Sequence, residues 1–327
     1  MPMRRMSTAV ASLTACLLFG AINEKAAAIV DGEDVGENDV GARSTVILLA
    51  PKHSCSAVVY GDSYILTTAH CLLDGDLKAP IDPHDLKIIY ARSLNQPGAA
   101  VRPVSTFVMH ENFVKQVEAI FSGSSGPLSF SNYPINHEDI AVIRVTGGHP
   151  NGVVSAILPE IGNDYVYWGL PKFRLLPLLW MDVYGFGSTA SGKVLHKLRV
   201  SAVTPDIVRT RMEPVLGVPY FPRQIIVRPD EMAAPDDPDW KSRGICHGDS
   251  GGPAFFVATG NTHNRPNTTL KLVAGRPILV GLMSRNASTQ NNNKLDEVAS
   301  EDCSNSFYLV RTDYYREWIL SRIKQMK

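Results

Sequence analysis

Short runs of apolar and β-branched residues, each ended by glycine, proline, asparagine or aspartate, recur along most of the chain. Runs of this length separated by turn-forming residues are typical of antiparallel strands, whereas alternating strands and helices would need long amphipathic segments between them. The pattern predicts strands over 45–49, 56–60, 86–91, 104–109, 140–145, 178–184, 197–203, 224–227, 254–257, 278–283 and 307–310. We therefore expect an all-β protein, either a sandwich or a pair of barrels.

The C-terminal segment, residues 312–325, is the one stretch that predicts a clear helix. Thr312 or Asp313 would cap its first turn. Three apolar residues recur at every fourth position and share one face of this helix: Tyr315, Ile319 and Ile323. Upstream, residues 122–134 are rich in serine, glycine and proline and predict a surface loop.

Residues 1–28 predict a secretory signal peptide. Arg4 and Arg5 supply a positive start, residues 6–22 are mostly small or apolar, and alanines 26–28 provide a signal-peptidase site. The mature domain would then span residues 29–327.

A cleaved signal has two alternatives, a membrane anchor and a lipid anchor. A membrane anchor is disfavoured because the apolar run is short and is interrupted by serines and threonines. Residues 13–16, Leu-Thr-Ala-Cys, resemble a lipobox that would place a lipid on Cys16, but the apolar residues 17–19 fit a continuing signal core better. We expect a secreted or periplasmic protein without stable membrane association.

Four cysteines remain after signal removal: Cys55, Cys71, Cys246 and Cys303. An even number in an exported chain predicts two disulfides, and the count alone leaves all three pairings open. A zinc site is the alternative, but the chain has neither a Cys-x-x-Cys motif nor a close cluster of cysteine and histidine.

The charge balance argues against a nucleic-acid partner. Lysine plus arginine and aspartate plus glutamate number 32 each, so the chain has no basic excess that would attract a phosphate backbone.

Residues 248–253 read Gly-Asp-Ser-Gly-Gly-Pro. A serine between glycines in a tight turn exposes its hydroxyl and leaves backbone N–H groups free to bind an oxyanion. The string also fits the nucleophile elbow of α/β-hydrolases, which requires an acid and then a histidine after the serine. Only His263 follows Ser250, so that interpretation fails.

The reverse order of residues is present upstream of the serine. His70 ends an apolar strand within Leu-Thr-Thr-Ala-His-Cys, and Asp139 opens another strand within His-Glu-Asp-Ile-Ala-Val-Ile. With the Ile-Val-Asp-Gly start at 29–32 and Tyr-Leu-Val at 308–310, these motifs closely resemble the trypsin/chymotrypsin family of serine endopeptidases. The resemblance implies two six-stranded antiparallel β-barrels, about 29–150 and 151–310, followed by the C-terminal helix.

The family's chemistry assigns a role to each motif residue. Ser250 would attack a carbonyl carbon, His70 would act as general base and then acid, and Asp139 would orient the imidazole. The N–H groups of Gly248 and Ser250 would form the oxyanion hole.

The resemblance also implies both disulfides, Cys55–Cys71 and Cys246–Cys303. The family's other common disulfides have no cysteines here, which favours a bacterial over an animal source.

In this family the α-amine of the first isoleucine pairs with the aspartate before the nucleophile, here Ile29 and Asp249. Because the best signal-peptidase site lies directly before Ile29, we expect export itself to create this amine without a separate propeptide.

The resemblance locates a specificity pocket. Gly244 takes the floor position and is followed by Ile245, so no carboxylate is available there for a basic side chain. A P1 residue that is apolar or small is therefore expected. The remaining wall positions are Ser284, Arg285, Asn286 and Ser306.

Other charged residues leave this preference open. Glu301 or Asp302 could restore binding of basic residues, and Arg285 could favour acidic ones.

The sequence therefore predicts an exported, monomeric serine endopeptidase that acts on proteins or peptides without a cofactor or metal. Two alternatives are a non-catalytic binding protein on the same fold and an esterase that uses the same triad.

Overall fold

The computed structural model describes residues 29–30, 32–74, 79–123, 138–159, 180–187, 194–202, 224–229, 244–257, 270, 272–286, 303–304 and 307–327. The predicted signal peptide and Ser306 lie outside these residues.

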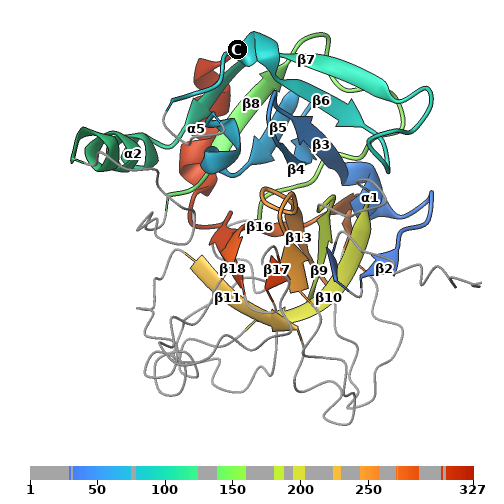
Figure 1. Cartoon of the computed structure of the whole chain (residues 1–327). Helices are drawn as coiled ribbons and strands as arrows, with labels where there is room; N and C mark the ends of the chain where they lie inside the picture. Colours follow the sequence, from blue (N-terminus) through green and yellow to red (C-terminus); the bar gives the residue numbers. More distant parts are fainter. Residues whose placement is uncertain are drawn as a thin grey trace, which may run out of the picture.

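Six antiparallel strands of the N-terminal half close into a barrel (Figure 1). In spatial order they are β3 (Thr45–Leu49), β4 (Ser54–Tyr60), β5 (Tyr64–Thr67), β8 (Ala141–Val145), β7 (Ala100–Met109) and β6 (Lys87–Tyr90). Side chains alternate as a pleated strand requires: Val46 and Leu48 fill the barrel interior, while Ile47 packs in a second cluster between the barrel and the rest of the molecule.

The C-terminal half forms a second antiparallel sheet. Its order is β11 (Gln224–Pro229), β18 (Phe307–Arg311), β16 (Leu279–Asn286), β13 (Pro253–Phe256), β9 (Trp180–Gly185), β10 (His196–Ala202) and β2 (Glu33–Asp34). Strand β10 also pairs with β11, so six of these strands form a closed ring and β2 is added outside it. The predicted double-barrel, all-β fold with a C-terminal helix is confirmed.

Five short strands form two smaller sheets beside the second barrel. One sheet joins β1 (Ile29–Val30), β12 (Gly244–Cys246) and β17 (Cys303–Ser304). The other is a two-stranded sheet of β14 (Leu272–Val273) and β15 (Arg276–Pro277).

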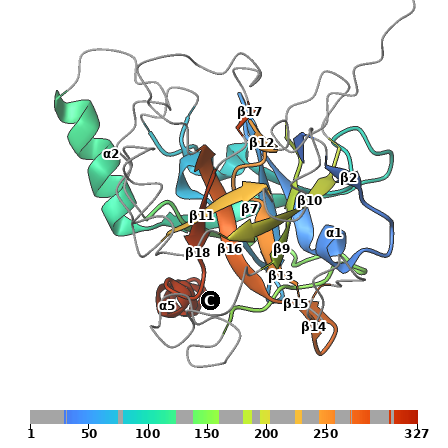
Figure 2. The ribbon, with the colours of Figure 1, turned by 90° about the horizontal axis from the view of Figure 1, so that it is seen from below.

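The two ends of the domain cross to opposite halves (Figure 1), and they lie on opposite sides of the molecule when it is seen from below (Figure 2). Near the N-terminus, β2 pairs with β10 of the second sheet. At the other end, helix α5 (Arg316–Gln325) packs on the first barrel, where Arg144 donates to the Met326 carbonyl (2.6 Å) and Tyr64 donates to the Ile323 carbonyl (3.3 Å). Each half is thus held by a segment from the other end of the chain.

The predicted helix start at 312 is wrong, because both expected capping residues have other partners. The Thr312 hydroxyl donates to the Leu279 carbonyl (2.5 Å), and Asp313 forms a two-point ion pair with Arg311 (2.6 and 3.0 Å). The apolar face is as expected, since Tyr315 and Ile319 are buried.

Four further helical segments were not predicted. Three are short: α1 (Val40–Ser44), η1 (Ala69–Leu72) and η2 (Pro83–Asp85). The fourth, α2 (Glu111–Gly123), buries Phe113 and Val117 on one face and takes in the first two residues of the predicted loop 122–134.

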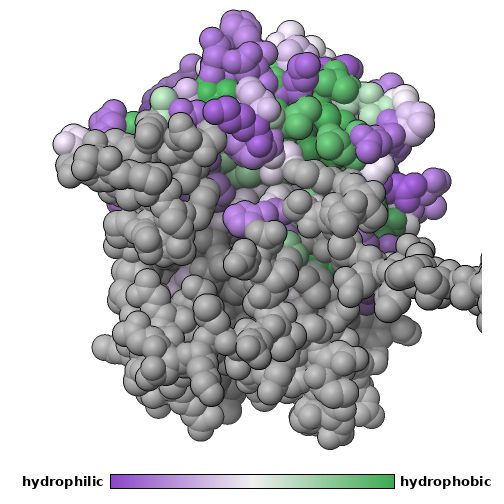
Figure 3. Space-filling view, viewed as in Figure 1, coloured by the Kyte–Doolittle hydropathy of each residue, from purple (hydrophilic) through white to green (hydrophobic). Residues whose placement is uncertain are grey.

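Hydrophilic and hydrophobic residues are interspersed over the first barrel on the face that Figure 3 shows. No helix of the described residues is both long and apolar enough to cross a membrane.

Candidate active site

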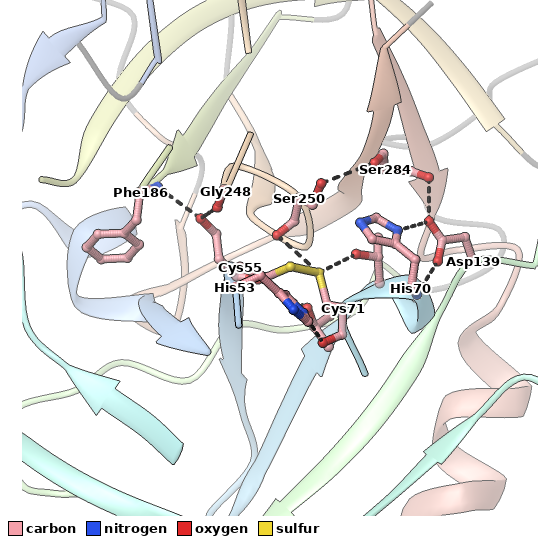
Figure 4. Close-up of a disulfide and its surroundings, with 12 residues drawn as sticks. His53, Cys55, His70, Cys71, Asp139, Phe186, Gly248, Ser250 and Ser284 are labelled. Carbon is pink, nitrogen blue, oxygen red and sulfur yellow. Dashed lines mark hydrogen bonds and ion pairs between the residues drawn. A yellow bond between two sulfur atoms is a disulfide. The ribbon is translucent and has the colours of Figure 1, made fainter. Parts of the chain in front are cut away.

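His70 and Asp139 form a buried hydrogen-bonded pair at one edge of the first barrel. His70 lies in η1, directly after β5, and Asp139 precedes β8, the strand beside β5. The His70 Nδ1 and Asp139 Oδ2 atoms are 2.7 Å apart, and the His70 backbone N–H donates to Asp139 Oδ1 (2.9 Å) (Figure 4). Since a carboxylate only accepts, the imidazole carries its proton on Nδ1 and directs Nε2 away from Asp139.

A third donor reaches the same carboxylate from the second barrel. Ser284 in β16 donates its hydroxyl to Asp139 Oδ2 (2.6 Å). Burial alone would raise the pKa of Asp139, but the adjoining His70 ring and the hydrogen bonds from His70 and Ser284 hold it below its ordinary value. Asp139 is therefore charged over the whole neutral range.

A disulfide braces the histidine. Cys55 in β4 is bonded to Cys71, the residue after His70, as predicted, and the Cα atoms are 6.1 Å apart. Both sulfur atoms lie within 4.8 Å of a His70 ring nitrogen, and this is the one such group found among the described residues. Because the sulfurs are bonded to each other, neither is a thiolate that could ligate a metal.

Ser250 lies in a tight turn between β12 and β13 that docks on the first barrel. The Gly248 carbonyl accepts from the Ser56 hydroxyl (2.8 Å) and the Ser250 carbonyl accepts from the Ser56 N–H (2.9 Å). Gly251 has a φ of 78°, and a Cβ there would collide with Thr67 Oγ1 and the Ser56 carbonyl. Only glycine permits this approach to the strand that leads to His70.

Ser284 connects the turn to the histidine–aspartate pair. The Ser250 hydroxyl donates a long hydrogen bond to the Ser284 carbonyl (3.4 Å), while the Ser284 side chain binds Asp139. Figure 4 shows these residues around the Cys55–Cys71 disulfide. Residues predicted from three separate motifs thus lie in one hydrogen-bonded group.

Asp249 is fully buried, and its carboxylate accepts hydrogen bonds from backbone N–H groups next to the turn that carries Ser250. Its Oδ1 accepts from the Gly187 N–H (2.7 Å) and its Oδ2 from the Cys246 N–H (2.7 Å). Gly185 passes so close that a Cβ there would collide with this carboxylate. Ile29 is also fully buried, and its backbone lies opposite Ile245.

The residues predicted for the specificity pocket are spread over two strands. Gly244 and Ile245 belong to β12, where Ile245 is buried with Ile29 in an apolar cluster. Arg285 and Asn286 end β16, where their backbones lie opposite β18. Ser284, the wall residue that precedes them in β16, contacts Asp139 and Ser250.

Cys246 is disulfide-bonded, and its backbone lies directly opposite Cys303 in the pairing of β12 with β17. This register agrees with the predicted Cys246–Cys303 bond, which stays a prediction.

Sequence reasoning missed two contributors to the site. It assigned Ser284 to the pocket wall alone, and it gave Ser56 no role. Both are serines inside apolar strands, and no local motif distinguishes such a serine from an ordinary strand residue.

The fold and the site together define a double-barrel protein in which a histidine–aspartate pair of one barrel faces a glycine-flanked serine of the other. The trypsin family model matches residues 29–298, so the chain belongs to the trypsin family.

Relatives in that family are distant in sequence. Trypsin-1 of Astacus astacus is 25% identical over 220 residues, which cover 64% of this chain and 74% of that protein. Trypsin epsilon of Drosophila erecta is 26% identical over 254 residues, or 74% and 80% of the two chains. The fibrinolytic enzyme, isozyme C, of Lumbricus rubellus is 25% identical over 209 residues, or 62% and 69%.

Proposed function

We propose that this protein is an exported serine endopeptidase that hydrolyses peptide bonds through an acyl-enzyme intermediate. The observation that carries the proposal is the hydrogen-bonded group around Asp139, which joins His70 directly and Ser250 through Ser284. Membership of the trypsin family supports peptidase chemistry at this group.

Each member of the group has a distinct role in the proposed mechanism. The Ser250 oxygen attacks the scissile carbonyl carbon while His70 Nε2 removes the hydroxyl proton, and His70 then gives that proton to the leaving amine. Asp139 accepts from Nδ1 throughout, which keeps Nε2 as the basic atom and stabilises the imidazolium. Water then releases the acyl group from Ser250 by the same proton transfers in reverse.

The backbone N–H groups of Gly248 and Ser250 would bind the oxyanion that forms during attack. Gly248 adopts a φ of 96°, a backbone conformation that residues with a side chain rarely adopt. Hydrogen bonds from Ser56 to the carbonyls of Gly248 and Ser250 hold the turn in place. Donors that are fixed in advance stabilise developing charge by about 3 kcal/mol each.

Asp249 would hold that turn in its active form by pairing with the α-amine of Ile29. Isolated buried carboxylates are unfavourable unless a positive charge or hydrogen bonds compensate them. Ile29 is buried beside β12, the strand that leads to Asp249, and cleavage before Ile29 would supply a charged amine there. N-terminal sequencing of the active secreted protein should find Ile29 first, and any other start contradicts this route.

The P1 preference is apolar or small. Gly244 offers no side chain at the pocket floor, and the side chain of Ile245 is uncharged and buried in an apolar cluster with Ile29. A buried lysine or arginine of a substrate would lack a partner at these positions, which costs several kcal/mol. A peptide-library cleavage profile dominated by arginine or lysine would contradict this preference and favour Glu301 or Asp302 as a recruited acid.

The remaining features of the proposal come from the sequence. The protein acts after export, in a secreted or periplasmic location, as a monomer on protein or peptide substrates and without cofactor or metal. Lipid attachment at Cys16 is the minor alternative. A bacterial source stays a prediction, since the relatives named above are from animals.

Labelling with a fluorophosphonate probe tests the central proposal, because the probe reacts only with an activated serine. The probe should modify Ser250 in the wild type and leave the His70→Ala variant unmodified. A folded wild type that is not labelled would favour the non-catalytic binding protein. Turnover of ester substrates with none of peptides would favour the esterase.

A further inference from the structure

Glu138 is a buried carboxylate that the proposed mechanism does not use. It directly precedes Asp139, and the two residues are 4% and 5% exposed. Burial of a second carboxylate beside the first is unfavourable unless hydrogen bonds compensate it. The hydrogen-bond partners of Glu138 therefore help to fix the chain next to Asp139.

One partner of Glu138 belongs to helix α2. The side-chain amide of Asn112 donates to Glu138 Oε1 (3.2 Å). Asn112 lies in the first turn of α2 and is itself exposed, so its amide covers the buried carboxylate from the solvent side.

The same stretch of chain holds the residue on the other side of Asp139. The His110 N–H donates to the Ile140 carbonyl (3.0 Å), and the Ile140 N–H donates to the Glu138 carbonyl (2.8 Å). Asp139 thus lies between two anchors, one at Glu138 and one at Ile140, and both come from residues 110–112.

Residues 110–112 are in turn fixed to the C-terminal helix. The Glu111 carboxylate pairs with Arg322 and accepts from Trp318 Nε1 (3.1 Å). The His110 ring lies against the rings of Trp318 (5.0 Å between centroids) and Tyr315 (5.4 Å). Helix α5 therefore provides a rigid base for the stretch that holds the aspartate.

We propose that Asn112 and Glu138 are positioning residues for the reaction. Their hydrogen bond fixes the backbone on one side of Asp139, so that the carboxylate meets both His70 Nδ1 and the His70 N–H. The inference rests on the proposed function and adds two residues that touch neither the substrate nor the reacting atoms.

Steady-state kinetics on a peptide amide test the inference. Because a small misplacement of a catalytic group can lower turnover 10²-fold, Asn112→Ala should lower kcat about tenfold and change KM less than about twofold. Glu138→Ala should cause a similar loss, and the double variant should lose no more than either single one, since both remove the same hydrogen bond. Glu138→Gln keeps an acceptor oxygen and should restore kcat to within about threefold of the wild type.

Lys115→Ala is the matched control, because Lys115 is an exposed residue of the same helix. It should leave both kcat and KM unchanged. Asn112 is also exposed, so Asn112→Ala should fold, and thermal unfolding checks this for each variant.

Each other outcome contradicts the inference. Unchanged kcat in Asn112→Ala, a loss confined to KM, a Glu138→Gln variant as slow as Glu138→Ala, or additive losses in the double variant would each overturn it. Failure of the proposed function is distinguishable, because the wild type would then show neither peptide turnover nor probe labelling.

Discussion

The two halves of the site are held in different ways. On the first barrel, His70 and Asp139 are fixed by side-chain hydrogen bonds and by the Cys55–Cys71 disulfide. On the second barrel, the turn that carries Ser250 is held by backbone hydrogen bonds, by glycines in close contact and by one buried carboxylate, that of Asp249.

This difference indicates which half of the site can become disordered while the other half stays folded. The hydrogen bonds and covalent bond around His70 form as the first barrel closes and need no added charge. The conformation of the turn around Ser250 depends on the partners of the buried Asp249 carboxylate. A buried charge of this kind is favourable only when its partners are in place. We therefore expect perturbations of the first half to alter chemistry or stability, and perturbations of Asp249 to disorder the nucleophile turn alone.

The largest effect is expected from Asp139→Asn. The amide would present a donor to a histidine nitrogen, which favours the tautomer with its proton on Nε2 and removes the general base. Turnover of a peptide substrate should fall about 10⁴-fold. Loss of the charge should also lower the thermal stability at neutral pH, because the folded protein lowers the pKa of Asp139. Retention of a tenth of the wild-type kcat would show that Asp139 does not orient His70.

Asp249→Asn should lower kcat about 10²-fold, because one of the two N–H groups that it accepts from would face an amide donor. The loss should be accompanied by slower fluorophosphonate labelling of Ser250, while the His70–Asp139 pair remains intact. A histidine NMR resonance that reports the His70–Asp139 hydrogen bond should persist in this variant. Its disappearance would mean that the two halves are not independently held.

Much of the fold was readable from the sequence because its strands are short, apolar and separated by turn residues. The run 45–49 matches β3 residue for residue, and the disulfide beside His70 follows from the family motif. The start of α5 was misplaced because Thr312 and Asp313 bind Leu279 and Arg311 instead of capping the helix. The partner of Thr312 lies 33 residues away in the sequence, and no local pattern reveals it.

The site was predicted where motifs carry it and missed where contacts cross between barrels. Glycines around Ser250 and the strand ends at His70 and Asp139 have local signatures. The contact of Ser284 with Asp139 spans 145 residues of sequence, and its geometry exists only once both barrels have folded. Helix α2 was missed although Phe113, Val114 and Val117 recur at helical spacing, and these three side chains pack on the core of the first barrel.

Removal of the disulfide should act on stability more than on chemistry. The Cys55→Ala/Cys71→Ala variant opens a loop with a sequence separation of 16, for which chain entropy predicts a loss of about 3 kcal/mol. Urea denaturation of the wild type and variant measures this loss. Reduction of kcat by more than about tenfold in the folded variant would show instead that the bond also orients His70.

The smallest effect is expected from Ser284→Ala, which removes one of the hydrogen bonds to the Asp139 carboxylate and keeps the two from His70. A hydrogen bond to a charged group contributes about 1.5–3 kcal/mol, part of which water could replace. The kcat should therefore fall about tenfold, and the free energy of unfolding should fall by about 1.5 kcal/mol at neutral pH.

The difference in stability between the wild type and Ser284→Ala should itself depend on pH. Because the folded protein lowers the pKa of Asp139, the stabilisation is complete above the ordinary value of 3.8 and is lost as the pH falls through the lowered pKa. Unfolding measured from pH 7 down to about pH 3 should therefore show the wild type and variant converging at the acid end. A difference that stays constant would mean that Ser284 stabilises the barrel contact itself rather than the charge of Asp139.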